Sequence, residues 1–226
     1  MSAIFVTATG TDIGKTYVTA GLIRTLRAQG RPVSALKPVV SGFEMAAVEK
    51  SDPGLLLQAM GRAVTSPSVA ALSPWRFHAP LSPDMAAARE GRTIDFAELI
   101  TFCRDAIDSA RGTLFIEGVG GVMVPLDSTH TVCDWIAALG IPAILVAGTY
   151  LGTISHTLTA LDALLSRHVA VCALVLNESD NASVPVAETI GTLVRFVHPI
   201  PVTATPRAGN PALSDETFRR LHEHLE

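Results

Sequence analysis

Five short apolar runs, rich in β-branched residues and bounded by Gly, Pro or polar residues, constrain the fold of this 226-residue chain most. They span residues 3–9, 32–40, 113–118, 142–148 and 170–177. Runs of this kind suit strands that are buried on both faces of a sheet. Helical patterns lie between them, at residues 16–29, 95–110, 131–139 and 155–167. The alternation predicts an α/β fold with a mainly parallel sheet flanked by helices on both faces.

Length and composition predict one globular domain over residues 1–226. Hydrophobic residues make up 48% of the chain and charged residues 17%, so burial can offset chain entropy. A formal net charge of −4 leaves no large cationic surface, which argues against nucleic acid as a partner. The sequence shows neither a secretory signal pattern nor an apolar run of membrane-spanning length, so we expect no membrane partner and a cytoplasmic location.

Other segments carry weaker expectations. Cys103, Cys133 and Cys172 match neither a disulfide framework nor a metal-binding spacing, so they are expected to be buried small apolar residues. The stretch 41–92 is rich in Ser, Pro and Gly and is too long for a bare loop, which predicts an excursion over the functional site. The polar tail is expected to form a surface helix that begins at Ser214.

The stretch TATGTDIGKTYVTAG, residues 7–21, joins the first apolar run to the first helical pattern. A strand that enters a Gly/Thr loop ending in Gly14, Lys15 and Thr16 turns backbone N–H groups toward an anion at the helix N-terminus. The strict pattern GxxxxGK[ST] fails, because Thr9 stands five residues before Gly14. Lys15 can still reach outer phosphates, and the Thr16 hydroxyl can bind Mg²⁺. The competing interpretation is a plain turn followed by a capped helix.

Magnesium at this loop needs further oxygen ligands. Glu117 ends the apolar run LFIEG, where a carboxylate is poorly solvated unless it meets a cation or hydrogen-bond donors. Asp52, in KSDPG, is a second candidate. The alternatives are a capping or turn carboxylate at Glu117 and an ordinary Asp-Pro-Gly helix start at Asp52.

Lysine is rare in this sequence, so the positions at which it occurs are informative. Only Lys15, Lys37 and Lys50 are lysines among seventeen basic residues, and the first two lie at candidate site positions. Lys37 ends the run SALKPVVSG with few local partners, so a bound anion would stabilise its charge, and Ser41 follows as a donor. A lysine extending into solvent from a strand end is the alternative interpretation.

A second junction between strand and helix lies in GTYLGTISHT, residues 148–157. Gly152, Thr153 and Ser155 would form another helix N-terminus suited to a carboxylate, although a plain N-cap explains Ser155 equally well. His156 lies in this turn and is given no role.

Taken together, several motifs resemble the dethiobiotin synthetase family along nearly the whole chain, in order and at similar spacing. They are TATGTDIGKT, LKPVVSGFE, Ser51-Asp52, FIEGVGGVMVPL with Asp134-Trp135, YLGTISH and VLNE. The loop of that family typically reads GTDTxVGKT, one residue longer than the strict pattern, which accounts for the mismatch. The chain departs from it at Ala8 in place of Gly, Gly10 in place of Asp and Asp12 in place of a frequent Glu.

The resemblance implies a single-domain P-loop NTPase fold and an ATP-dependent ring closure. In that reaction 7,8-diaminononanoate takes up CO₂ as a carbamate, ATP phosphorylates the carbamate, and the second amine closes the cyclic urea of dethiobiotin. Lys15 and Lys37 would be catalytic, and Thr16, Asp52 and Glu117 would hold Mg²⁺. The residues implied to bind ATP are Thr11, Asp12, Ile13, Gly14, Lys15, Thr16, Tyr17, Asp52, Glu117, Gly118, Gly120, Asn177, Glu178, Thr205, Pro206 and Arg207.

The resemblance also implies a homodimer in which the carboxylate tail of the substrate lies on the second helix N-terminus of the neighbouring subunit. The residues implied to bind the substrate are Lys37, Ser41, Gly120, Leu151, Gly152, Thr153 and Ser155. Two alternatives compete with this reading. One is a partner-regulated switch ATPase with a related phosphate loop, although the early Lys of KGGxGKT loops is missing here. The other is a nucleotide-binding module without turnover.

Overall fold

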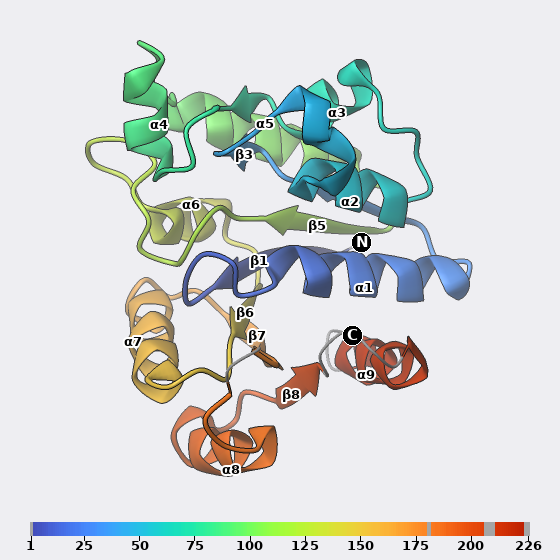
Figure 1. Cartoon of the computed structure of the whole chain (residues 1–226), viewed down its shortest axis with the longest axis vertical. Helices are drawn as coiled ribbons and strands as arrows, with labels where there is room; N and C mark the ends of the chain where they lie inside the picture. Colours follow the sequence, from blue (N-terminus) through green and yellow to red (C-terminus); the bar gives the residue numbers. More distant parts are fainter. Residues whose placement is uncertain (1, 180–181, 206–210, 224–226) are drawn as a thin grey trace.

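The computed structural model describes residues 2–179, 182–205 and 211–223. Six parallel strands form the main sheet in the order β2-β5-β1-β6-β7-β8, and Figure 1 shows helices on both sides of it. The strands are β1 (Ser2–Ala8), β2 (Val33–Leu36), β5 (Thr113–Glu117), β6 (Ala143–Ala147), β7 (Val171–Asn177) and β8 (Val202–Thr205). The predicted mainly parallel α/β sheet is thereby confirmed.

Two hydrophobic clusters lie on opposite faces of the sheet. In β1, Ile4 and Val6 belong to one cluster and Phe5 to the other, because successive side chains of a strand alternate between faces. The first face packs against α1 (Lys15–Ala28), α2 (Asp52–Ala59), α3 (Ser66–Leu72) and α9 (Pro211–Glu223). The second packs against α4 (Pro83–Arg89), α5 (Phe96–Ser109), α6 (Val132–Leu139), α7 (Thr153–Ser166) and α8 (Val186–Val197). Helices therefore cover both faces, as predicted.

The single strand predicted over residues 32–40 is wrong. β2 ends at Leu36, and β3 (Val39–Val40) leaves the main sheet to pair with β4 (Trp75–Arg76). Pro38 explains the break, because proline has no N–H to donate to a strand ladder. The excursion after β3 holds the 3₁₀ segment η1 (Met45–Lys50), α2, α3, β4 and α4.

Other differences concern where elements begin. α7 begins at Thr153 rather than Ser155, because Gly152, with φ of 95°, supplies the left-handed turn before the helix. α9 begins at Pro211 rather than Ser214, and β8 and α8 were not predicted. Cys103 and Cys133 are buried as expected, whereas Cys172 is only half-buried. Within the described residues, no helix combines the length and apolar character needed to cross a membrane.

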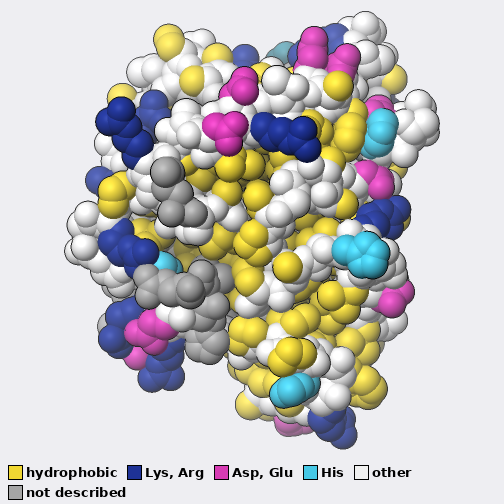
Figure 2. Space-filling model, turned by 180° about the vertical axis from the view of Figure 1, so that it is seen from behind, with side chains coloured by type: hydrophobic (Ala, Val, Ile, Leu, Met, Phe, Trp, Pro, Cys, Tyr) yellow, Lys and Arg dark blue, Asp and Glu magenta, His cyan; other side chains and the backbone are white. Residues whose placement is uncertain are grey.

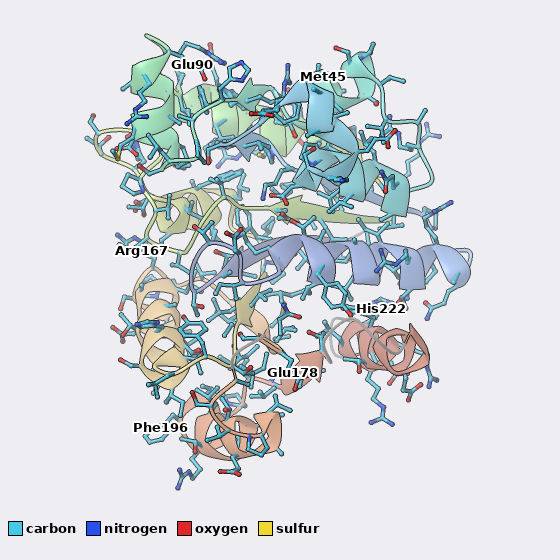
Figure 3. The ribbon with its side chains drawn as sticks, viewed as in Figure 1. Met45, Glu90, Arg167, Glu178, Phe196 and His222 are labelled. Carbon is cyan, nitrogen blue, oxygen red and sulfur yellow. The ribbon has the colours of Figure 1, made fainter. Side chains whose placement is uncertain are left out.

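Exposed hydrophobic side chains gather at one end of the molecule. Figure 2 shows them over the lower end of the rear face, the end at which α8 lies in Figure 1. Phe196 of α8 is 64% exposed and lies at this end in Figure 3. Val194 of α8 and Leu165 of α7 are also exposed. An exposed apolar surface of this kind is suited to contact another protein molecule.

Candidate functional site

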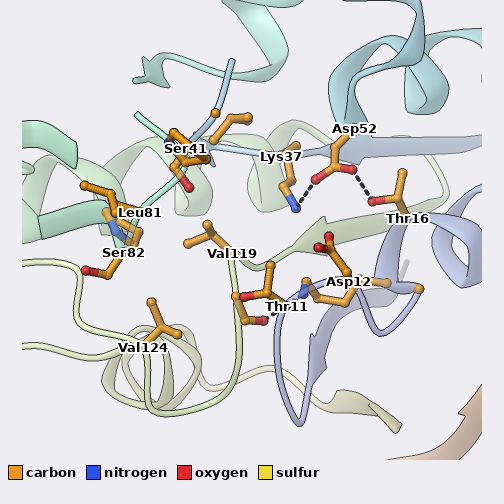
Figure 4. A pocket seen from close by; sticks show the side chains of 17 residues that line it. Thr11, Asp12, Thr16, Lys37, Ser41, Asp52, Leu81, Ser82, Val119 and Val124 are labelled. Carbon is orange, nitrogen blue, oxygen red and sulfur yellow. Dashed lines mark hydrogen bonds and ion pairs between the residues drawn. The ribbon is translucent and has the colours of Figure 1, made fainter. Parts of the chain in front are cut away.

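A cavity of about 770 Å³ lies at the carboxyl ends of β2, β5 and β1, which are neighbours in the sheet. Figure 4 shows side chains from these strand ends and from the excursion pointing into it. It brings together nine of the predicted residues: Thr11, Asp12, Gly14, Lys15, Thr16, Lys37, Ser41, Asp52 and Gly120. Five segments that follow strands were expected to meet in one crevice at the strand carboxyl ends. Residues from 9–16, 37–41 and 117–121 line this cavity, whereas residues 148–152 and Asn177 do not.

The phosphate loop runs from the end of β1 to the start of α1. Gly14 adopts φ of 100° and precedes the first helical residue, Lys15. The Lys15 ammonium donates to the carbonyl of Gly120 at 2.7 Å and to that of Gly10 at 3.1 Å. Two loops are therefore bridged by one cation beside a helix N-terminus. A helix N-terminus beside a buried positive charge is suited to binding phosphate.

Replacing Gly14 by Ala is expected to weaken nucleotide binding by tenfold or more. A Cβ at Gly14 would lie 2.1 Å from Nδ2 of Asn177, and φ of 100° is unfavourable for any side chain. The loop would have to shift at the position where its N–H groups converge. The measurement is equilibrium binding of ADP.

Gly30→Ala is the matched control. Gly30 follows α1 with φ of 70°, and a Cβ there would meet nothing within 4 Å. The Gly30→Ala variant has an unfavourable φ but no collision, so its affinity for ADP should stay near that of the unaltered protein. Equal losses in the two variants would contradict this account of the loop.

Lys37 lies at the centre of a buried cluster of charges beside the loop. Its ammonium is 2.7 Å from Oε1 of Glu117 and 2.8 Å from Oδ2 of Asp52, and it donates to the Gly118 carbonyl at 2.8 Å. Lys37 is 2% exposed and Glu117 is fully buried. Figure 4 shows the Lys37 ammonium directed toward Asp52, whose carboxylate also faces Thr16. The extension into solvent considered for Lys37 is therefore wrong.

The pKa values of the two lysines of the site shift in opposite directions. Burial alone would lower the pKa of Lys37, but the adjacent Glu117 and Asp52 carboxylates outweigh it and raise that pKa. For Asp52, burial would raise the pKa, but the Lys37 ammonium outweighs it, so the pKa is lowered. Burial lowers the pKa of Lys15 to about 8, and repulsion by Lys37 adds to the effect. Lys37 thus stays charged, whereas Lys15 can lose its proton in weakly alkaline solution.

Nucleotide affinity is therefore expected to fall as pH rises above about 8. Only protonated Lys15 attracts phosphate, so below its lowered pKa the cation is already present, and above it binding must take up a proton. The loss approaches tenfold per pH unit, about 1.4 kcal/mol. Calorimetry of ADP binding between pH 7 and 9.5 measures both affinity and proton uptake. The Lys15→Arg variant should show little pH dependence of ADP affinity, because its guanidinium stays charged. An ADP affinity that does not change with pH in the unaltered protein would contradict the prediction.

The oxygen atoms around Thr16 are suited to a divalent cation. Its hydroxyl lies 2.7 Å from Oδ1 of Asp52 and 2.7 Å from Oε1 of Glu117, but it has one proton and can donate to only one of them. Oε2 of Glu117 is buried without a hydrogen-bond partner among the described residues. An all-oxygen set with an unsatisfied carboxylate fits Mg²⁺. Among the described residues, no three His, Cys, Asp or Glu side chains lie together so that they could hold a metal ion, so such a metal would need phosphate or water ligands as well.

Three predicted residues close to the loop lie outside the cavity. Ile13 accepts a hydrogen bond from Asn177, and the Tyr17 ring packs against Phe218 of α9, with ring centroids 5.7 Å apart. Gly118 acts through its carbonyl, which Lys37 contacts.

The resemblance implies that Asn177 and residues around Pro206 contact adenine, and Asn177 and Thr205 lie at the adjoining ends of β7 and β8. Asn177 donates from Nδ2 to the Ile13 carbonyl and accepts from the Thr205 hydroxyl, both at 2.9 Å. The Glu178 N–H donates to the Thr205 carbonyl at 3.2 Å. Thr205 is fully buried, and its part in ATP binding stays a prediction. Pro206 and Arg207 lie outside the described residues.

The second predicted helix N-terminus does not line the cavity of its own chain. Leu151 is 85% exposed, and Gly152 and Ser155 are also exposed. The Thr153 hydroxyl is buried and donates to the Gly148 carbonyl at 2.6 Å. Among these residues, Thr153 therefore stabilises the turn, whereas Leu151, Gly152 and Ser155 face away from the protein interior. His156 is 2.9 Å from the Tyr150 hydroxyl.

Several lining residues were not predicted. They are Pro80, Leu81, Ser82, Pro83 and Val124. Residues 80–83 belong to the excursion that was expected over the site, and their Pro-Leu-Ser-Pro run was its only local signal. The mostly apolar character of this wall suits the hydrocarbon part of a small ligand.

Comparison with known proteins gives both sequence and structural relatives. A family model described as "AAA domain" matches residues 2–205. The ATP-dependent dethiobiotin synthetase BioD of Acidiphilium cryptum (strain JF-5) is 53% identical over 97% of this chain and 100% of that protein. The protein of that name from Caulobacter vibrioides (strain NA1000 / CB15N) is 46% identical over 93% of this chain and 94% of its own length. Among solved structures, the septum site-determining protein MinD of Pyrococcus horikoshii OT3, complexed with Mg-ADP, matches with a TM-score of 0.61. The match covers 100% of this chain and 96% of that chain at 17% identity, so it shows the fold alone.

Proposed function

The chain belongs to the ATP-dependent dethiobiotin synthetase family, and we propose that it closes the ureido ring of dethiobiotin from 7,8-diaminononanoate, CO₂ and ATP. One observation carries the proposal most directly. Thr16, Lys37, Asp52 and Glu117 form one connected cluster. Three of them, Thr16, Lys37 and Asp52, line a single cavity together with Lys15, and this cavity is large enough for a nucleotide phosphate chain and a small organic substrate. We also propose that residues 1–226 act as one synthetase domain in the cytoplasm.

The two lysines would divide the electrostatic work. Lys15, at the start of α1, would neutralise the outer phosphates of ATP beside the loop N–H groups. Lys37 would face the transferred phosphoryl group and the carbamate, where charge accumulates as the phosphoryl moves. Ser41, which lines the cavity after β3, would hold the substrate next to that carbamate. The second amine could then attack the activated carbon and release phosphate, leaving ADP and dethiobiotin.

Mg²⁺ would be held by Thr16, Asp52 and Glu117 together with phosphate and water oxygens. When bound, it would draw charge from the phosphate oxygens and hold the phosphate chain in line for transfer. The carboxylates of Asp52 and Glu117 contact the Lys37 ammonium. If these carboxylates bound a metal instead, the Lys37 ammonium would be available to the reacting anions.

A homodimer would complete the substrate site. Three residues of the second helix N-terminus, Leu151, Gly152 and Ser155, face outward rather than into the cavity of their own chain. From this position they could bind the carboxylate tail of a substrate that lies in the cavity of a second copy. The apolar end at which Phe196 is exposed offers a surface for such contact.

Nucleotide turnover tests the proposal, because a synthetase should couple it to the other substrates. ADP release, measured with Mg²⁺, should require both 7,8-diaminononanoate and bicarbonate as the source of CO₂. Omitting either should reduce release to a small background. Equal ADP release in the absence of the diamine would contradict the proposal and favour the partner-regulated switch ATPase.

A further inference from the structure

The purine-binding side of the site contains a buried threonine that acts through another residue. Asn177 and Thr205 are paired across β7 and β8, at the last residue of each strand. Asn177 is half-buried, whereas Thr205 is fully buried. Asn177 therefore keeps exposed surface that a ligand could contact, whereas the hydroxyl of Thr205 does not.

Two hydrogen bonds fix the orientation of the Asn177 amide. The Ile13 carbonyl can only accept, so the amide nitrogen must face it, at 2.9 Å. The amide oxygen then faces Thr205, whose hydroxyl donates to it at 2.9 Å. Gly14 leaves room for this arrangement, since a Cβ there would lie 2.1 Å from the amide nitrogen. The amide is thus held between the phosphate loop and the end of β8.

After these two bonds, the amide retains one N–H and one oxygen lone pair for a ligand. This pair matches the adenine edge, where the N7 atom accepts and the N6 amino group donates. Guanine has acceptors at both N7 and O6, so its O6 would face the amide oxygen without a proton between them. Rotation of the amide would remove this discrimination.

We propose that Thr205 is a positioning residue for purine preference: its hydroxyl anchors the Asn177 amide so that it accepts from adenine and disfavours guanine. The inference rests on the proposed function in that the site takes a purine nucleotide whose base lies at Asn177. It assigns to a residue outside the cavity a role that the lining residues alone do not explain.

Thr205→Val tests the proposal in the full-length protein, because it keeps the shape of the side chain and removes only the donor. Thr205→Ser keeps the donor. Thr203→Val is the matched control, since Thr203 lies two residues earlier on the same strand and undergoes the same replacement of a hydroxyl by a methyl group. Equilibrium binding of ADP and GDP is measured for each variant, and thermal unfolding identifies any that fail to fold.

Thr205→Val is expected to weaken ADP binding about tenfold, the scale of one lost hydrogen bond of about 1.4 kcal/mol, while GDP affinity stays the same or rises. The ratio of the two affinities should return to the original value in Thr205→Ser and remain unchanged in Thr203→Val. A folded Thr205→Val protein with the original ratio, or an equal loss for ADP and GDP, would overturn the proposal. Steady-state turnover should show the change in KM for ATP and little change in kcat.

Failure of the proposed function would be distinguishable. Nucleotide binding can be measured whether or not dethiobiotin forms. If the protein discriminated ADP from GDP through Thr205 but closed no ring, the role of Thr205 would stand and the proposed function would be wrong.

Discussion

Replacing Lys37 by Gln should leave ATP binding largely intact and slow ureido-ring formation by about 30- to 900-fold. The expected cost is about 2–4 kcal/mol in the activation barrier, the scale of one electrostatic stabiliser of the transition state. The neutral amide of Gln cannot offset the charge that builds on the transferred phosphoryl group and the carbamate. The measurement is single-turnover formation of product, with ATP binding measured separately.

Folding has to be separated from chemistry in this experiment. Glu117 is fully buried beside Lys37, and removing one partner of a buried ion pair costs about 3–5 kcal/mol of stability. Lys37→Arg keeps the positive charge but replaces a compact ammonium by a planar guanidinium, so it should fold more readily and still react slowly. Lys50→Gln is the control because Lys50 is exposed at the end of η1. Unchanged ring formation in folded Lys37→Gln would show that Lys37 has a different role.

Replacing Lys15 by Ala should weaken ADP and ATP binding by roughly 10- to 150-fold and abolish measurable product at ordinary ATP concentrations. A hydrogen bond to a charged group contributes about 1.5–3 kcal/mol, and here it is the contact with the outer phosphates. The variant also loses the bonds to the Gly10 and Gly120 carbonyls that bridge the two loops. Calorimetry with ADP gives the affinity, and product analysis gives the reaction.

Lys50→Ala is the matched control, since it removes an exposed lysine from the same region of the chain. It should bind nucleotide and form product like the unaltered protein. If Lys15→Ala bound ADP with unchanged affinity, the phosphate position assigned to the loop would be wrong.

The central part of the site was predictable because its residues end buried strands. Lys37 and Glu117 follow the apolar runs that became β2 and β5, and the loop of Gly14 to Thr16 follows β1. Carboxyl ends of parallel strands share one edge of a sheet, so strand identity alone predicted that these side chains would meet. Asp52 needed the resemblance, because an Asp-Pro-Gly start is common to many helices.

Features that depend on contacts distant in sequence were not predictable. β8 is only four residues long, Val202–Thr205, and nothing in so short a run reveals that it pairs with β7. The break at Pro38 was visible, but not that Val39–Val40 would pair with Trp75–Arg76. Thr205 was implied to bind ATP by the resemblance alone, and only packing shows that its hydroxyl is buried against Asn177.

Transfer of carbon from bicarbonate to product tests the account most directly. The purified protein is incubated with 7,8-diaminononanoate, ATP, Mg²⁺ and isotopically labelled bicarbonate, and the products are examined by mass spectrometry. The account predicts labelled dethiobiotin together with ADP, and loss of both in Lys15→Ala. Continued ATP hydrolysis with no labelled product would contradict it.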